Sequence, residues 1–315
     1  MTPRPFLIRY ARQFGTLFGL ILLCIALWIA TPYFLTSSNL LNIMEQSAIN
    51  ALIAVGMTFI IISGGIDLSV GSLVAFTGVV LAGFLHNGWP WPVAVACGLI
   101  VGLGCGILNG LLVTLGRLPP FIATLGTMSV ARGAALLYTD GRPASGFDSG
   151  FRSLATGQVL HIPTPAVIML IVYGLGHFVL TRTKFGRYTY AIGGNEEAAL
   201  LSGVRVRLYK TLIYGAGGLL SALAAVLLTA RLNSAQPIAG INYELDAIAA
   251  TVIGGTSLLG GQGTMGGTLV GALIMGVLRN GLNLLGVSSF VQQVVIGAVI
   301  ILAVLVDVLF KPKKK

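Results

Sequence analysis

Charge is the property that this sequence has least of. Only 9% of its 315 residues are Asp, Glu, Lys or Arg, whereas a soluble domain usually contains about 25%. Acidic residues are scarcer than basic ones, with 9 Asp and Glu against 19 Lys and Arg, so the net charge is +10. The basic residues stand at the ends of apolar runs, as membrane topology requires. This placement excludes an ordinary soluble domain and argues against nucleic acid as a partner.

Motifs for ATP, metal or covalent chemistry are also missing. No Gly-x-x-x-x-Gly-Lys-Ser/Thr loop is present and no glycine is followed by lysine, so the chain carries no usual ATP-binding apparatus. Ser145 has no histidine near it in sequence, which argues against a serine nucleophile. The cysteines and histidines, which lack disulfide or metal-ligand spacing, are Cys24, Cys97, Cys105, His86, His161 and His177. We therefore predict no catalytic residue, no metal site and no cofactor.

Long apolar runs are what the chain has instead. Apolar residues make up 56% of it, and the mean hydropathy is +0.93. Runs of roughly twenty residues with little charge predict an all-α fold, a polytopic membrane helix bundle that forms a single domain over 1–315. The ten candidate spans are 14–34, 46–64, 69–86, 92–116, 120–138, 163–181, 209–230, 246–259, 265–285 and 289–309. The run 246–259 is short and 120–138 contains Arg132, so these two are candidates for broken or re-entrant helices.

Basic residues set the orientation of the bundle. Trp28 stands where a cleaved signal peptide would need a small residue, so we predict an uncleaved first span. With both termini in the cytoplasm, 14 Lys and Arg residues fall on the inner side and only Arg142, Arg152 and Arg231 on the outer side. The inner residues are Arg4, Arg9, Arg12, Arg117, Arg182, Lys184, Arg187, Arg205, Arg207, Lys210, Lys311, Lys313, Lys314 and Lys315.

Two parts of the chain resemble each other at an offset of 196 residues, the difference between positions 64 and 260. The matching positions are Gly64, Gly65, Gly71, Leu73 and Val74 with Gly260, Gly261, Gly267, Leu269 and Val270, preceded by Ala51 and Ala54 with Ala247 and Ala250. We interpret this as an internal repeat, a frequent feature of transporters whose path lies between the repeats. Chance similarity between glycine-rich membrane sequences is the alternative.

Glycines recur at helical spacing in two of the predicted spans. Gly98, Gly102, Gly106 and Gly110 lie on one side of a helix, and Gly267 and Gly271 do the same on a later one. Small residues at this spacing allow two helix backbones to approach closely. The pattern predicts tight helix packing without indicating what the bundle does.

The longest polar interruption, Thr181 to Lys210, contains a short predicted helix. Asn195 is its expected N-cap, Glu196 and Glu197 suit the positive end of its dipole, and Gly203 suits its C-terminal end. The helix leaves an apolar side formed by Ala198, Leu200 and Leu201. Since the basic residues place this segment, the loop 182–210, in the cytoplasm, we expect another protein to cover that side.

Ionisable groups within the apolar runs are costly and mark functional candidates. Asp67, in Ser-Gly-Gly-Ile-Asp, either caps a helix that starts near Leu68 or takes part in transport. Arg132 and Arg279 either pair with acids inside the bundle or extend to an interface. The outer stretch 230–246 either lines a polar vestibule or forms a solvated loop, and its hydrogen-bonding side chains are Asn233, Gln236, Asn242 and Glu244.

Several motifs carry a resemblance to a known family. Glu197-Ala-Ala-x-x-x-Gly203 is similar to the short signature of permease subunits in bacterial ABC importers, although the usual apolar-proline ending is absent. The wider match covers the chain from the first span to Asp307. It consists of Ala54–Thr58, Ser63–Gly71, Ala191–Asn195, Tyr243–Ala250, Gly254–Ser257 and Asn280–Ser288. Together these segments resemble the ribose-type, or monosaccharide, permeases of ABC importers.

The resemblance implies a permease subunit in the bacterial cytoplasmic membrane, surrounded by lipid. Its implied partners are a second permease copy, a cytoplasmic ABC ATPase that hydrolyses the ATP, and a periplasmic sugar-binding protein. The ATPase would dock on a coupling helix that comprises Gly194, Asn195, Glu196, Glu197, Ala198, Ala199 and Gly203. The candidate residues of the substrate pathway or its gate are Asn50, Asp67, Ser69, Gln236 and Glu244.

Two other classes of protein compete with this interpretation. An ion-coupled secondary sugar transporter would need a titratable group in mid-span, and no set of acids there suggests a proton or sodium relay. A membrane-embedded enzyme would need a nucleophile with a base, or a metal cluster, and neither pattern is present. Ribose is the substrate that the resemblance suggests, while xylose, fructose, galactose and other monosaccharides stay open.

Overall fold

The computed structural model describes residues 4–309, with the side chains of 15–302, 304 and 305. The membrane-length and shorter helices are α1 (Arg4–Ala30), α2 (Ser37–Ile62), α3 (Val70–His86), α4 (Trp91–Thr114), α5 (Pro120–Thr139), α6 (Ser149–Thr156), α7 (Thr164–Arg182), α8 (Lys184–Gly194), α9 (Glu196–Leu201), α10 (Val206–Leu232), α11 (Tyr243–Ile253), α12 (Met265–Leu284) and α13 (Ser289–Leu309). Two small antiparallel ribbons join β1 (Ala144–Ser145) to β4 (Ser234–Ala235) and β2 (Gln158–Val159) to β3 (Ile162–Pro163).

A helix coincides with each of the ten predicted apolar runs. Six of the helices in the described chain are long and apolar enough to cross a membrane, namely α2, α4, α5, α7, α10 and α12. The all-α membrane bundle is therefore confirmed, while the count of ten spans stays a prediction. The run 120–138 forms one unbroken helix, and 246–259 is helical only as far as Ile253.

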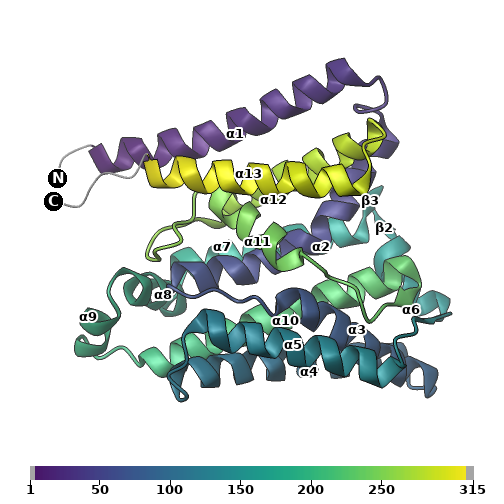
Figure 1. The fold of residues 1–315 in the computed structure, drawn as a ribbon, viewed down its shortest axis with the longest axis horizontal. Helices are drawn as coiled ribbons and strands as arrows, with labels where there is room; N and C mark the ends of the chain where they lie inside the picture. Colours follow the sequence, from purple (N-terminus) through teal and green to yellow (C-terminus); the bar gives the residue numbers. More distant parts are fainter. Residues whose placement is uncertain (1–3, 310–315) are drawn as a thin grey trace.

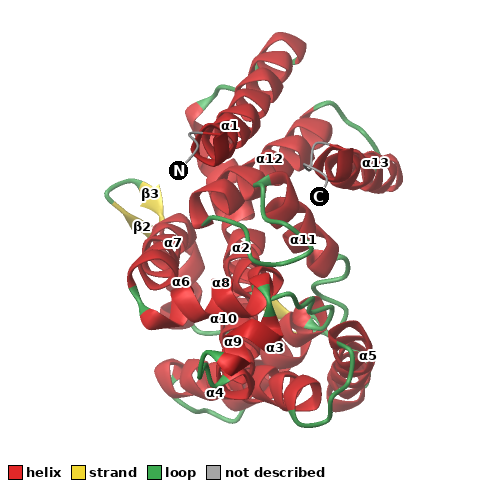
Figure 2. Cartoon of the chain, turned by 90° about the vertical axis from the view of Figure 1, so that its left-hand side faces the viewer, coloured by secondary structure: helices red, strands yellow, loops and turns green. Residues whose placement is uncertain are grey.

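Helix α2 lies at the centre of the bundle because it is apolar on every side. From Ser47 to Ile62, every residue except Asn50 is buried. Helices α4 and α5 lie on one side of it, and α1, α12 and α13 lie on the other (Figure 2). Helix α10 packs between α2 and α4, so the core runs along α2 and α10.

The predicted glycine contacts are confirmed. A Cβ on Gly102 or Gly106 would overlap backbone or Cβ atoms of α10, and one on Gly218 of α10 would overlap α4 in return. The later pair behaves in the same way, since Gly267 and Gly271 lie against the backbone at the end of α11. Helix backbones therefore touch directly at both places, as small residues in membrane helices allow.

Two ends of the bundle can be distinguished. Helices α8 and α9 lie at one end, together with the start of α1 and the end of α13 (Figure 1). Helix α6 and the β2–β3 ribbon lie at the opposite end. The lysines predicted on the inner side at 311 and 313–315 lie outside the described residues, as do the side chains of Arg4, Arg9 and Arg12.

Candidate functional site: a capped surface helix and a polar seam

The predicted short helix is present as α9. The side-chain oxygen of Asn195 accepts a hydrogen bond from the Ala198 amide at 2.9 Å, and Glu196 and Glu197 occupy the first turn. The helix ends at Leu201, and Gly203 then takes a φ of +84°, a conformation that costs glycine little. The local signals in the sequence were therefore sufficient to define this element.

The apolar residues of α9 divide into two sets. Ala199 is buried and packs with Ile192, Val204 and Val206, so one side of α9 rests on a small apolar cluster. Leu200 and Leu201 point away from this cluster and are 62% and 89% exposed. Two adjacent exposed leucines on a capped helix at the end of a membrane bundle present a surface that a partner protein can bury.

Helix α8 precedes α9 and was not expected from the sequence. It spans Lys184–Gly194, between the predicted span 163–181 and the N-cap of α9. Thr183 caps its N-terminus, and Phe185 stacks edge-on with Phe59 of α2. The polar loop is therefore a pair of short helices fixed to the core, rather than a single helix in an irregular segment.

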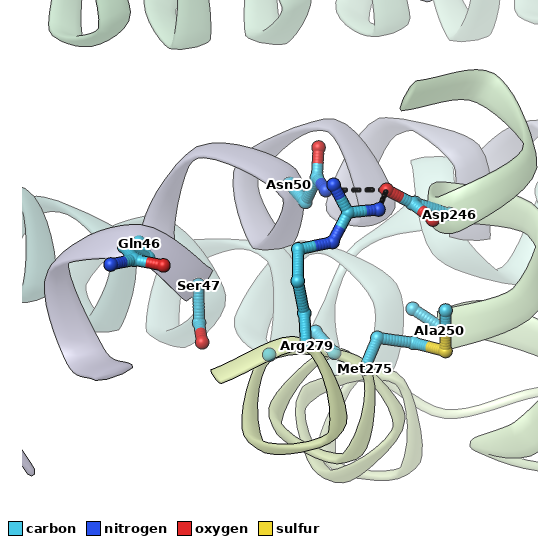
Figure 3. A pocket seen from close by; sticks show the side chains of 9 residues that line it. Gln46, Ser47, Asn50, Asp246, Ala250, Met275 and Arg279 are labelled. Atoms are coloured by element: carbon cyan, nitrogen blue, oxygen red, sulfur yellow. Dashed lines mark hydrogen bonds and ion pairs between the residues drawn. The ribbon is translucent and has the colours of Figure 1, made fainter. Parts of the chain in front are cut away.

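A polar seam, formed by Asn50, Asp246 and Arg279, joins α2, α11 and α12 (Figure 3). The Asp246 carboxylate is buried and accepts hydrogen bonds from Asn50 Nδ2 at 3.0 Å and from Arg279 Nη2 at 2.6 Å. Arg279 therefore pairs with an acid, which was one of its two predicted roles. The Arg279 side chain remains 40% exposed, so one side of the pair is open at the surface of the chain.

The polar seam borders a small cavity of about 40 Å³, which also touches Gln46, Ser47 and Gly276. Within the described part of the chain, Ser47 Oγ and Asn50 Oδ1 are buried without a hydrogen-bond partner. A space of this size holds water, which would satisfy such atoms. In this conformation the cavity is too small for a monosaccharide.

Asp67 lies in a second, closed polar cluster. Its Oδ1 accepts from the Ser69 amide at 2.8 Å and from Ser69 Oγ at 2.6 Å. Asn109 Nδ2 in turn donates to Ser69 Oγ at 2.8 Å. Asp67 does not cap a helix that starts near Leu68: α3 begins at Val70 with no side-chain cap, and Asp67 instead accepts from Ser69 in the turn before it. Asp67 and Ser69 are fully buried and do not border the cavity beside Asn50.

The stretch 230–246 is held against the bundle instead of forming a free loop. Arg132 of α5 donates to the carbonyl oxygens of Pro237 and Ala239, both at 2.7 Å. Arg132 therefore binds backbone carbonyls directly, and Glu244 lies close enough to interact with its charge. Gln236 and Glu244 are half-buried near this contact, and neither borders the polar-seam cavity.

The structure gives Ser145 no catalytic partner among the described residues. His86 Nε2 lies 3.2 Å from the backbone oxygen of Ser145, and the serine hydroxyl is not involved. In the same part of the chain no three His, Cys, Asp or Glu side chains are grouped to hold a metal.

Replacing Asp246 with alanine is expected to destabilise the bundle. The change leaves Asn50 and Arg279 without their acceptor, at a cost of about 1–3 kcal/mol, because the partly exposed Arg279 reduces the penalty of a fully buried pair. Thermal unfolding in detergent measures the loss. Glu45→Ala is the matched control, since it removes an ion-paired acid that is 27% exposed, against 3% for Asp246, and should cost less than about 1 kcal/mol. Equal losses in both variants would contradict this view of the polar seam.

Comparison with known proteins gives a consistent result. Residues 39–304 match the family model described as branched-chain amino acid transport system / permease component. The chain is 53% identical to the ribose import permease protein RbsC of Bacillus subtilis over 298 residues, which cover 94% of this chain and 92% of that protein. It is 49% identical to RbsC of Escherichia coli K12 over 93% of this chain and 92% of that one.

A relative whose name gives another sugar is less similar in sequence. The D-allose transport system permease protein AlsC of Escherichia coli K12 is 40% identical over 94% of this chain and 91% of that protein. No solved structure matches the chain significantly. The similarity to these permeases, together with the membrane-length helices, indicates a multi-pass protein of the bacterial inner membrane. The chain therefore belongs to the family of transport-system permease components that includes the ribose import permeases.

Proposed function

We propose that this chain is the permease subunit of a binding-protein-dependent ABC importer that moves ribose across the cytoplasmic membrane. The observation that carries this proposal is the 46–53% identity to ribose import permeases along almost the whole chain. The D-allose and xylose permeases are less similar, at 40% and 36% identity. A gradient of identity that falls as the sugar changes supports ribose over those two substrates.

The proposed partners are those that the similarity to ABC importer permeases implies, and the lack of an ATP-binding loop in the sequence fits a separate ATPase. ATP is hydrolysed by a separate cytoplasmic ABC ATPase, two permease copies form the path, and a periplasmic binding protein delivers the sugar. The chain serves as one membrane domain over 1–315, with the loop 182–210 as its contact with the ATPase. The exposed Leu200 and Leu201 support this contact, because a docked partner would remove them from water.

The topology proposed from the basic residues is ten spans with both termini in the cytoplasm. Its support is the position of α9 at the same end as the start of α1 and the end of α13 (Figure 1).

The internal repeat is supported by two pairs of consecutive helices, α2–α3 and α11–α12, which we call the broken helix pairs because a glycine turn separates the two helices of each pair. In these turns Gly64 and Gly260 have nearly equal φ values of +82° and +81°.

ATP-driven closure of the ATPase would move α9 as a rigid unit and reorient the bundle, which is a two-state element biased by a partner. The unit consists of Gly194, Asn195, Glu196, Glu197, Ala198, Ala199 and Gly203. Its cap at Asn195 and its apolar anchor at Ala199 support rigid movement, since the N-terminus and one side of the helix are held.

The sugar path is proposed to be polar and weakly binding, because the binding protein supplies most of the selectivity. Its candidate residues remain Asn50, Asp67, Ser69, Gln236 and Glu244, to which the polar seam adds Asp246 and Arg279. Of these, the polar seam has the best support, since it joins three helices beside a cavity that opens further if they separate. Asp67 and Ser69 are better suited to holding the α2–α3 turn.

Mild detergent extraction followed by co-purification tests the proposal. We expect an ABC ATPase and a sugar-binding protein to be recovered with the chain. When the three components are reconstituted in vesicles, ATP should drive uptake of labelled ribose, with unlabelled allose and xylose competing less well than unlabelled ribose. Recovery of the chain without an ATPase, together with ribose uptake that ignores ATP, would contradict the assignment.

A further inference from the structure

Three segments that are distant in sequence meet beside the N-terminus of α9, and the contact between them is made by glycine backbone. They are the turn after α2, the last turn of α8 and the turn before α12. Their contact residues, which we call the glycine junction, are Gly64, Gly193, Gly260 and Gly261. In Figure 1 the end of α2, helix α8 and the α11–α12 connection lie near the same end of the bundle as α9.

Gly193 is the centre of the junction. A Cβ on it would overlap the carbonyl oxygen of Ile62 at the end of α2 and crowd the amide nitrogen of Gly261. Gly260 is similarly confined, because a Cβ on it would crowd the Gly193 carbonyl oxygen and the Cα of Gly64, whereas a Cβ on Gly64 would make only an ordinary contact with Gly193. The backbones therefore touch with no side chain between them. A displacement of one segment is passed directly to the next, because no flexible side chain can absorb it.

The two turns are also bonded to each other and to α8. The Gly261 amide donates to the Ile62 carbonyl oxygen at 2.8 Å, which joins the second turn to the end of α2. The Tyr190 hydroxyl, one helical turn before Gly193, donates to the Gly263 carbonyl oxygen at 2.7 Å. Helix α8 is thus fastened to the α11–α12 connection at two levels.

The junction connects directly to α9 on one side and to the membrane helices on the other. Gly194 ends α8, and the next residue, Asn195, is the N-cap of α9. Beyond the first turn, the Ile66 carbonyl oxygen faces the hydroxyls of Tyr214 on α10 and Thr124 on α5, before α3 begins. Beyond the second turn, Thr264 caps α12.

We propose that the glycine junction transmits the movement of α9 to both broken helix pairs at once, with Gly193 as the positioning residue. This inference rests on the proposed function of α9 as the ATPase contact. Because Gly193 bears on the end of α2 and on the turn before α12, one push on α9 displaces equivalent points of the two repeats together. The direct backbone contact makes this a stiff connection, with two arrangements rather than a continuous range.

The test compares Gly193→Ala with Gly174→Ala on α7 in the complete importer, assembled with the ATPase and binding protein that co-purify with the wild-type chain. Both changes add one methyl group to a glycine in a helix, but a Cβ on the exposed Gly174 meets nothing within 4 Å. The readouts are ATPase recovery, ATP hydrolysis and ribose uptake. A purely structural defect lowers hydrolysis and uptake together, whereas a transmission defect lowers the uptake per ATP hydrolysed.

For Gly193→Ala we expect ATPase recovery and hydrolysis to persist while uptake per ATP falls at least about tenfold, within the usual range of coupling between linked sites. Gly174→Ala should stay within about twofold of wild type, as surface substitutions do. If Gly193→Ala prevents assembly, Tyr190→Phe is the variant that tests the junction. It removes one hydrogen bond to the Gly263 carbonyl and should lower uptake per ATP by about threefold to fivefold.

Equal uptake per ATP in Gly193→Ala, Gly174→Ala and wild type would overturn the junction while leaving the importer assignment intact. So would an unchanged Tyr190→Phe when Gly193→Ala does not assemble. Wild-type uptake that ignores ATP would instead contradict the proposed function, and the role of the junction with it. The failures of the two proposals are therefore distinguishable.

Discussion

A chain that carries Leu200→Asp and Leu201→Asp is expected to insert and fold normally but to lose its ATPase and its ATP-driven uptake. Both leucines are largely exposed, so the isolated permease loses no packing when they change. In the assembled importer each would be buried, and burial of a leucine is worth about 1.5–3 kcal/mol. Two such losses weaken the contact by at least about a hundredfold, since 1.4 kcal/mol is about a factor of ten.

Recovery of the ATPase with tagged permease measures this effect. Leu160→Asp is the matched control, because Leu160 is also 89% exposed but lies in the turn between β2 and β3, at the opposite end of the bundle (Figure 1). The control should retain the ATPase. Recovery of the ATPase at the wild-type level with the double variant would show that α9 is not its docking surface.

The largest effect on stability is expected from Gly106→Leu. The side chain would enter the contact between α4 and α10, where even a Cβ overlaps the Tyr214 carbonyl oxygen and crowds Gly215 and Gly218. Backbone lies on both sides of this contact, so the helices must separate. Overpacking of a core usually costs about 1–3 kcal/mol, and this site should lie at or beyond the upper end. Thermal unfolding of the detergent-solubilised protein provides the measurement.

Gly104→Leu controls for the new side chain itself. It adds the same leucine two residues earlier on α4, on an exposed position where a Cβ meets nothing within 4 Å. A leucine that faces lipid should leave the melting temperature nearly unchanged. Similar melting temperatures for the two variants would contradict the direct contact of α4 and α10.

Local signals in the sequence predicted much of the fold and one part of the site. Hydropathy marked the positions of ten helices, because a run of apolar residues needs no information about its neighbours. The glycine spacing on α4 identified the contact face before its partner was known. Asn195 and Gly203 defined α9, since both act on the backbone within a few residues of themselves.

Contacts between distant segments were not predictable in the same way. Arg279 was left with two possible roles, because its acid, Asp246, belongs to another helix 33 residues earlier. Asn50 and Asp246 are separated by 196 residues, the offset of the repeat, so the repeat alignment held a signal for this pair. Asp67 resembled a helix cap, but its carboxylate accepts from Ser69, two residues later, and from Asn109, which only the fold brings close.

Helix α8 and the glycine junction were missed for related reasons. Lys184–Gly194 contains three glycines and two basic residues, so its helical character depends on contacts with α2 and α10. Gly193 stood only within the motif Ala191–Asn195, and the close approach of Ile62 and Gly261 is visible only in three dimensions.

Transport by purified components tests the central claim most directly, namely that the energy comes from a separate protein and enters this chain through α9. Ribose uptake is measured in vesicles that contain the chain alone, with an imposed proton or sodium gradient, and in vesicles that also contain the ATPase and binding protein with ATP. We expect accumulation only in the complete system, and its loss with Leu200→Asp and Leu201→Asp. Accumulation of ribose by the chain alone, driven by an ion gradient, would contradict the account.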